Sequence, residues 1–409
     1  MKVKKMLAVF MSVLSLAACI LPFSACGKIV GNASDKGAKS GAVRNLTENI
    51  SKNDSGSKAA DKEFKAAAAS FSADLFKYNY SNGKTTLVSP LSVLTALALV
   101  QNGAEGETLV QLERALGGLD RDALNKYMRA YCDFLSAGDE LKIANSVWTD
   151  SSVEAKQAFL QKAVDSYSAQ IFSAPLSSKK TVSSINSWVK KNTDDMIPKI
   201  IESADRDAVM MLINAIAFDA KWETPYKRSD IEKLEFTSYS GSKKKTDFMC
   251  STENVYLKDS DAVGFMKPYK NGRFAFAALL PNEDVNIDDY IASLSGEKLM
   301  KIFSSAKKNE EVDVKMPKFK AEYSTQLIDT LKKMGVKDAF DSKTADFSSL
   351  IENRDAYIAT VVHKTFIEVD ENGTRAAAST LVGTDTMSLM EPYSVCLNRP
   401  FVYMIVDTE

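Results

Sequence analysis

A single histidine, His363, limits the chemistry that this chain of 409 residues can perform. A zinc site with two or three histidine ligands is impossible, and the five cysteines lack the CxxC-type spacing of a cysteine-only site. A Ser/His/Asp enzyme would have to route its proton transfers through His363, which lies in a short run of β-branched and aromatic residues typical of a strand. That context favours a hydrogen-bonded core residue over a catalytic base. We expect no metal and no cofactor.

The charge balance argues against another class of function. The chain carries 52 Lys and Arg residues against 53 Asp and Glu residues, a net charge of −1, so it lacks the basic excess that nucleic-acid binding needs. Its 45% hydrophobic residues are ordinary for a globular protein. We therefore expect no nucleic-acid partner.

The first 26 residues have the pattern of an export signal. Lysines near the start precede an apolar run over residues 6–18, which is too short to span a bilayer comfortably. The run LAAC ending at Cys19 is similar to the lipobox of bacterial lipoproteins. FSAC, ending at Cys26, is a looser match but is better placed, because a polar stretch follows it directly. We predict a signal peptide over 1–26, lipidation at Cys19 or Cys26, and a secreted protein anchored at the outer surface of a bacterial membrane.

The rest of the chain divides into a tether and one large domain. Residues 27–60 are rich in Gly, Ser, Asn, Asp and Lys without a sustained apolar period, which predicts a flexible polar tether. Nothing after residue 61 resembles a linker, so we predict a single domain over 61–409. The three cysteines in this domain show no spacing of a disulfide framework.

The order of predicted elements indicates the fold class. Apolar residues at helical spacing predict helices over 66–78, 91–100, 155–167, 182–201 and 323–334. Short β-branched and aromatic runs predict strands over 209–218, 274–280, 312–316, 361–369 and 401–406. Helices that come first, followed by strands with helices interspersed, indicate an α+β fold with large sheets.

One segment fits neither the core nor an ordinary loop. It begins at Glu371, lies between two predicted strands and extends for about two dozen residues to Val395. Structureless loops of this length are uncommon inside a domain and are usually functional. Its side chains are mostly small, with few charges and the run Ala376-Ala377-Ala378-Ser379 near its start.

The segment resembles the hinge and reactive-centre loop of serpins in Glu371, Gly373, Thr374 and the alanine run. Arg375 departs from the family pattern, which has an acidic residue at that position. Other matches follow the family's order over residues 61–409: VSPLS at 88–92, ANSVW at 144–148, INSWV at 185–189, LINA at 212–215, KW at 221–222, MPKF at 316–319, LKKMGV at 331–336, ADF at 345–347 and VCLNRPFVY at 395–403.

The resemblance implies the serpin fold, a single large α+β domain with eight or nine helices, three β-sheets and an exposed reactive-centre loop. It also implies a monomeric inhibitor of serine proteases, and not an enzyme. A protease attacks a bait bond in the loop and forms an acyl-enzyme, and the cleaved loop enters the main sheet as a new strand before that ester hydrolyses.

The family's registry assigns roles to the hinge, which comprises Glu371 and residues 373–380. In the inserted strand alternate side chains face the core. The side chains that would face inward are those of Thr374, Ala376, Ala378 and Thr380, and those that would face outward are Arg375, Ala377 and Ser379. The charge of Arg375 would therefore not be buried without a partner, although an acidic residue is usual at this position. Gly373 would supply the backbone freedom of a hinge.

The resemblance also places the bait bond and the residues beneath the sheet. The family's usual distance from Glu371 gives an antitrypsin-like bond at Met387–Ser388, and cleavage at Thr386, Leu389 or Met390 stays open. An unbranched Met side chain fits the apolar pocket of elastase-, chymotrypsin- or subtilisin-like proteases. Serpins have a polar cluster, called the shutter, where the strands of the main sheet part, and it is matched here by Ser89, Ser92, Asn214 and His363. Trp222 matches the family's aromatic residue at the top of the sheet, where the loop enters.

One departure and three alternatives accompany this interpretation. Serpins have one more central strand after the NRPF motif, and no match to it follows Glu409. Either the sequence is truncated or the natural protein lacks the strand, and we expect a cavity and exposed ladder groups where it would lie in the chain as given. The alternatives are a non-inhibitory serpin that acts as a substrate-like or ligand-binding surface protein, an envelope-tethered hydrolase built around His363, and a solute-binding lipoprotein.

Overall fold

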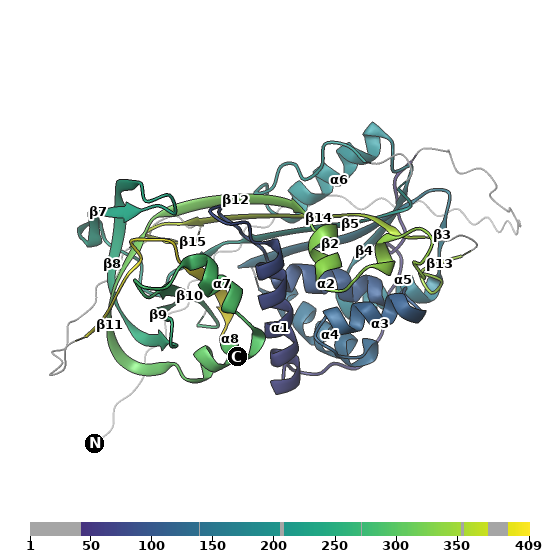
Figure 1. Ribbon diagram of the computed structural model, residues 1–409. Coiled ribbons are helices and arrows are strands. Elements are labelled where there is room, and N and C mark those ends of the chain that lie inside the picture. The colour runs from purple at the N-terminus through teal and green to yellow at the C-terminus, as the bar shows by residue number, and fades with distance from the viewer. Residues whose placement is uncertain (1–41, 139, 205–207, 271, 353–355, 375–391) are drawn as a thin grey trace, which may run out of the picture. The chain divides into compact units, whose positions relative to one another are not determined.

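Nine α-helices and three β-sheets form the part of the chain that the computed structural model describes, residues 42–138, 140–204, 208–270, 272–352, 356–374 and 392–409 (Figure 1). This confirms the predicted α+β fold. None of the helices in these ranges is long and apolar enough to cross a membrane.

Most of the helices belong to the first half of the described chain, as predicted. Their bounds are α1 Lys62–Asn79, α2 Pro90–Gln101, α3 Gly106–Ala115, α4 Arg121–Ala137, α5 Gln157–Tyr167, α6 Lys179–Asn192, α7 Ile287–Ser293, α8 Gly296–Ser304 and α9 Ile328–Lys333. Ser89 caps the start of helix α2, where its side chain accepts the N–H of Ser92, and Pro90 occupies the first turn, where it loses no hydrogen bond.

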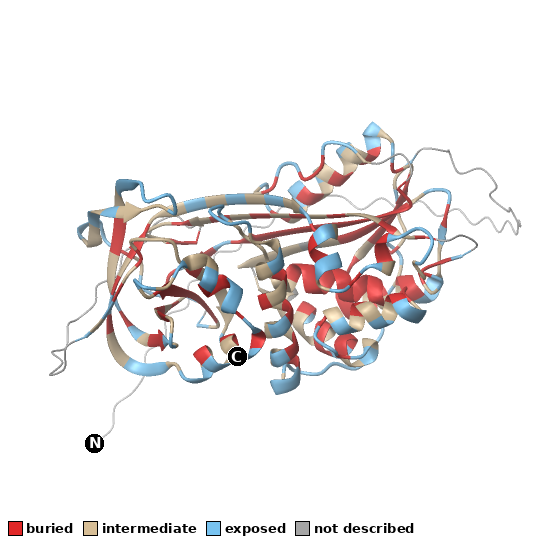
Figure 2. Cartoon of the chain, in the orientation of Figure 1, coloured by how far each residue is buried: buried red, intermediate tan, exposed pale blue. Residues whose placement is uncertain are grey.

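The main sheet has eight strands in the order β1-β4-β2-β5-β14-β15-β6, with β12 paired to β14. Their bounds are β1 Arg44–Asn45, β4 Gln170–Ala174, β2 Leu141–Asp150, β5 Met210–Phe218, β14 Ile358–Val369, β15 Gly373–Thr374, β6 Ala220–Lys221 and β12 Phe319–Gln326. The central strand β5 is buried along its whole length (Figure 2). Its Leu212 packs in the core that contains α2, and Met211 packs in the core that contains α6, so the sheet is covered on both faces.

A second sheet has seven strands in the order β16-β11-β8-β9-β10-β17, with β7 paired to β8. Its bounds are β7 Ile231–Thr237, β8 Lys243–Lys258, β9 Ala262–Pro268, β10 Phe274–Pro281, β11 Lys307–Pro317, β16 Tyr393–Cys396 and β17 Val402–Asp407. A third sheet joins only β3 Glu154–Ala155 and β13 Ile351–Glu352.

Two predicted helices differ from the structure. The segment 323–334 is the end of strand β12 followed by the short helix α9, because residues 319–326 alternate between half-buried and exposed positions, the period of a strand with one covered face. The helix predicted over 182–201 is α6, which ends at Asn192.

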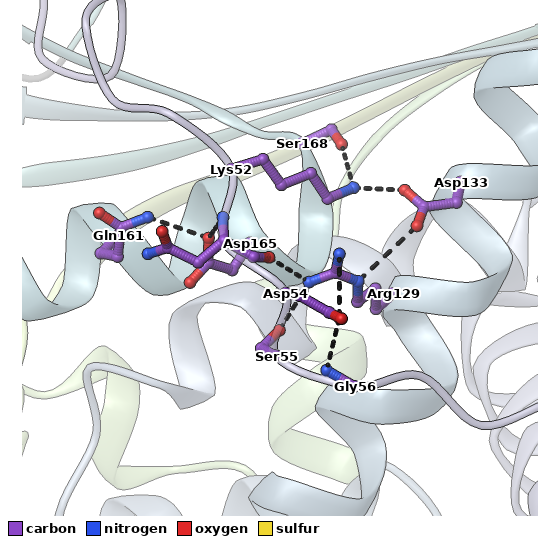
Figure 3. Close-up of polar contacts among 10 residues, drawn as sticks. Lys52, Asp54, Ser55, Gly56, Arg129, Asp133, Gln161, Asp165 and Ser168 are labelled. Carbon is purple, nitrogen blue, oxygen red and sulfur yellow. Dashed lines mark hydrogen bonds and ion pairs between the residues drawn. The ribbon is translucent and has the colours of Figure 1, made fainter.

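The folded part begins earlier than the sequence predicted (Figure 3). Strand β1 pairs antiparallel with β4 at the edge of the main sheet. The backbone N–H of Asn53 donates to Asp165 of α5 at 2.7 Å, and Lys52 pairs with Asp133 of α4. Residues 42–60 therefore differ from the predicted tether, because Val43, Leu46 and Ile50 pack against the apolar cores and polar side chains of the helices bind the residues that follow. Residues 1–41, which contain the predicted signal peptide and both candidate lipidation cysteines, lie outside the described residues.

Candidate functional site

The two central strands of the main sheet form an unusual seam. Strands β5 and β14 run parallel, with Leu212 opposite Val361 and Asn214 opposite His363. Each has an antiparallel neighbour on its other side, β2 for β5 and β12 for β14. A strand that ran antiparallel between β5 and β14 would therefore replace one parallel pairing by two antiparallel ones, which are slightly more stable per residue.

The beginning of the hinge already occupies that position at one end of the seam. The chain turns after Val369, where the Asp370 carboxylate accepts the backbone N–H groups of Asn372 and Gly373. It then returns as β15, which pairs antiparallel with β14 on one side and with β6 on the other (Figure 1). Because β6 follows β5 directly in the chain, β15 lies between the two halves of the sheet that would have to separate.

Close packing holds the two residues of β15. A Cβ atom on Gly373 would lie 2.2 Å from the carbonyl oxygen of Ala220, so no side chain fits there. Gly373 has no positive φ. In this state the glycine is thus required by the approach of β6, and the backbone freedom of a moving hinge stays a prediction. Thr374 is fully buried, and its hydroxyl lies 2.6 Å from that of Tyr269.

Glu371 forms the outer contact of the hinge. Its carboxylate lies 2.7 Å from the ammonium of Lys318 in a partly exposed ion pair. The hydrogen bond from Lys318 holds the pKa of Glu371 below its ordinary value. The pair links the turn after β14 to the loop between β11 and β12.

Trp222 lies at the same end of the sheet, as the resemblance implied. Its backbone N–H donates to the carbonyl of Asn372 at 3.0 Å, and its indole N–H donates to that of Asp370 at 2.8 Å. The backbone N–H of Tyr226 donates to the carbonyl of Glu371 at 2.8 Å. The indole also stacks on Tyr269, with ring centroids 4.6 Å apart. Three consecutive carbonyls of the hinge turn are therefore bound by one short segment, 222–226.

The four predicted shutter residues meet beneath the middle of the seam. His363 of β14 and Asn214 of β5 contact each other through Nδ1 and Oδ1 at 2.6 Å. The Asn214 amide also donates to the carbonyl of Ser92 in α2 at 2.7 Å, and the backbone N–H of Ser89 donates to His363 Nε2 at 3.0 Å. The cluster thus joins both central strands to the helix below them.

These contacts define the state of the histidine. Since Nε2 accepts from a backbone N–H, the proton of the neutral ring is on Nδ1 and points to Asn214. Complete burial lowers the pKa of His363 to about 3. Its hydrogen-bond partners among the described residues are an amide oxygen and a backbone N–H, neither of which is a nucleophile, so the geometry gives no support to a hydrolase.

The structure brings together Glu371, Gly373, Thr374 and Trp222 at one end of the seam, and Ser89, Ser92, Asn214 and His363 at its middle. Arg375, Ala376, Ala377, Ala378, Ser379, Thr380, Met387 and Ser388 lie outside the described residues. Within the described ranges, no group of three or more His, Cys, Asp or Glu residues is placed to hold a metal ion.

Sequence reasoning missed several residues of the site. Asn145 of β2 accepts a hydrogen bond from the Asn214 amide and extends the shutter to a third strand. Tyr226 and Tyr269 bind the hinge, but no spacing or motif singled them out. Asn145 and Lys318 lie inside two of the motifs that resemble the family, ANSVW and MPKF, so the resemblance could have identified both residues.

Comparisons with known proteins agree with this geometry. The family model described as "Serpin (serine protease inhibitor)" matches residues 66–409. The leukocyte elastase inhibitor of Bos taurus is 30% identical over 373 residues, which cover 84% of this chain and 95% of the relative. Serpin B3 of Homo sapiens is 30% identical over 375 residues, which cover 83% and 94%.

Solved structures give the same result. Native tengpin, a thermophilic serpin, is 41% identical with a TM-score of 0.83, and the match covers 89% of this chain and 96% of tengpin. Its latent state gives a TM-score of 0.74 at 39% identity, over 86% of this chain and 95% of that one. With its hinge between β14 and β6, its polar cluster beneath the seam and a family model that matches most of its length, the chain belongs to the serpin family of protease inhibitors.

Proposed function

We propose that this protein is a suicide-substrate inhibitor of serine proteases. The observation that carries the proposal is the position of β15, whose two residues already lie between β14 and β6. Cleavage in the loop would free its amino-terminal part to extend β15 along the seam. Each ladder hydrogen bond gained would contribute about 0.5–1.5 kcal/mol net. The insertion would then carry the attached protease away from its exposed position.

The bait bond proposed is Met387–Ser388. The serine Oγ of the protease attacks the carbonyl carbon of Met387, the bond to the Ser388 nitrogen breaks, and an ester remains. A methionine at this position favours elastase-, chymotrypsin- or subtilisin-like enzymes over trypsin-like ones, which prefer a cation. The similarity to a leukocyte elastase inhibitor supports this choice.

The shutter suits a sheet that must open. Hydrogen bonds between Asn214, His363 and Ser92 can exchange partners as the strands separate, whereas an interdigitated apolar plug would have to repack. The polar seam therefore lowers the barrier to insertion, while Asn214 and His363 keep hydrogen-bond partners in the closed sheet.

The test mixes the protein with neutrophil-type elastase, chymotrypsin, subtilisin and trypsin. A covalent band near the summed mass on a denaturing gel, with a released peptide that starts at Ser388, would support the proposal. Met387→Arg should transfer trapping to trypsin, while Leu389→Arg serves as the matched control and should leave the preference unchanged. Cleavage without any covalent band would contradict inhibition by trapping.

We also propose that the protein is secreted as a monomer and anchored by lipid at Cys19 or Cys26. The support is the apolar run followed by the two lipobox-like sequences. Cys19→Ala and Cys26→Ala variants identify the modified residue when the membrane fraction is analysed by mass spectrometry. The anchor would be contradicted if neither variant were released into the medium and the wild-type peptide carried no lipid mass.

A second candidate function is a non-inhibitory serpin that holds an apolar ligand. It is favoured by a cavity of about 1170 Å³ lined by residues of α1, α8, β10 and β17, among them Phe76, Phe303 and Tyr403. Native mass spectrometry that finds an apolar ligand, together with cleavage but no trapping, would favour this candidate.

A further inference from the structure

A buried ion pair lies beneath the hinge and takes no part in the function proposed so far. Lys267 of β9 and Glu253 of β8 are 2% and 8% exposed, and the ammonium lies 2.7 Å from the carboxylate. Ser251 donates its hydroxyl to the same carboxylate oxygen at 2.6 Å. Removing two charges from water is costly, and a well-packed apolar pair would stabilise such a site equally well or better. The ion pair therefore calls for an explanation other than stability.

The contacts of Lys267 lead to the segment that binds the hinge. Its ammonium lies 4.4 Å from the ring centroid of Tyr226 and 5.5 Å from that of Trp222. The Tyr226 hydroxyl lies 3.2 Å from that of Ser251. Both aromatic residues belong to segment 222–226, whose N–H groups hold the hinge carbonyls. The charge thus fixes this segment against the second sheet from below.

We propose that Lys267 and Glu253 are positioning residues that keep the uncleaved loop from entering the main sheet. For β15 to lengthen, β5 must separate from β14, and β6 and the segment after it, which follow β5 directly in the chain, must move with β5. That movement would draw the aromatic faces of Trp222 and Tyr226 away from a desolvated ammonium, whose attraction to them is strongest in a water-free site. The ion pair therefore resists opening at the end of the seam where opening begins.

The inference rests on the proposed function, because it requires that the loop can enter the sheet. Its test needs no protease target. A synthetic peptide with the sequence of residues 374–387 is offered to the uncleaved protein, and the rate of its incorporation is measured. The rate at which the uncleaved chain becomes heat-resistant at 37 °C, through insertion of its own loop, is measured separately.

Three variants separate positioning from structure. Lys267→Met/Glu253→Gln removes both charges and leaves no charge unpaired, and Lys267→Arg keeps the cation. Lys298→Met is the matched control, since Lys298 pairs with Asp261 at 2.9 Å and lies 4.6 Å from the Tyr290 ring. Among the described residues it has no hydrogen bond, ion pair or ring contact to residues 370–374 or to segment 222–226. The double variant should incorporate the peptide and convert at least about tenfold faster than wild type, while the other two should stay within about twofold.

The stability of the cleaved form distinguishes positioning from a merely structural role, because a structural role would change that stability as well. If positioning is the role, the heat-denaturation midpoint of the cleaved, inserted protein should be the same in wild type and double variant. Wild-type rates in the double variant, or equal acceleration by Lys298→Met, would overturn the inference and leave the proposed function intact. A wild-type chain that gains no heat resistance after cleavage in its loop would overturn the proposed function itself.

Discussion

The neutral, buried state of His363 leads to a sharp prediction about pH. The hydrogen-bond partners of both ring nitrogens suit only the neutral form of His363. A proton on Nε2 would point at the N–H of Ser89, which is itself a donor, so that hydrogen bond would be lost. Lowering the pKa from 6.5 to about 3 corresponds to a cost of about 5 kcal/mol for protonating the ring in place, at about 1.4 kcal/mol per tenfold change in proton affinity. We expect the ring to stay neutral throughout the pH range of ordinary assays.

The chain has one histidine, so its imidazole NMR signals belong to His363 alone. In the folded protein these signals should not shift between pH 8 and pH 4.5, with the Nδ1 proton retained. A titration midpoint above about pH 5 would refute the assignment of a dry, doubly hydrogen-bonded ring.

The same reasoning fixes the sign of the effect on stability. The unfolded chain takes up a proton at His363 as the pH falls below 6.5, whereas the folded chain does not, so the stabilising contribution is complete above pH 6.5 and is lost as the pH falls towards 3. At pH 5 the loss is about 2 kcal/mol. Urea unfolding at pH 7 and pH 5 measures it, and His363→Gln is the control, since its unfolding free energy should lack this part of the pH dependence.

Three further substitutions test the hinge and the N-terminal segment. Gly373→Ala would force β6 away, since the new Cβ would lie 2.2 Å from the Ala220 carbonyl oxygen; we expect a loss of about 1–3 kcal/mol in thermal unfolding and less trapped protease on a gel. Thr374→Glu would bury an unpaired charge, so cleaved protein should exceed covalent complex, and equal partition would contradict the insertion model. Asp165→Ala removes the acceptor of the Asn53 N–H and should expose residues 42–60 to limited trypsin digestion well before the rest of the domain, whereas an unchanged digestion pattern would show that the segment is held elsewhere.

Much of the fold follows from patterns that a sequence displays directly. The apolar run of β5, interrupted only by Asn214, and the start of α2 are local features, and both appear where the sequence predicts them. The last four residues of strand β12, 323–326, were mistaken for the start of a helix because alternation over so few residues cannot be told from one face of a helix.

Other features depend on contacts between residues far apart in the chain. Asn53 and Asp165 are separated by 112 residues, and nothing in the composition of residues 42–60 indicates that partners exist for its polar groups. The same holds for the hydroxyl contact between Tyr269 and Thr374, separated by 105 residues. The shutter and Trp222 were found only because motifs matched a family, since an Asn or His in an apolar run indicates a buried polar contact without naming its partner.

The middle of the seam and its hinge end differ in chemistry because they face different demands. At the shutter, neutral groups such as Asn214 and His363 join both central strands to α2 through hydrogen bonds that can be exchanged one at a time as the strands separate. Beneath the hinge, the charges of Lys267 and Glu253 cannot be separated or exposed to an apolar neighbour without a large cost. In such a sheet, the ion pair would make the first step, opening at the hinge end, slow. Once that end has opened, the exchangeable hydrogen bonds at the middle would let the strands separate quickly. That combination is what a trap requires, because the uncleaved loop must wait and the cleaved loop must insert before the ester hydrolyses.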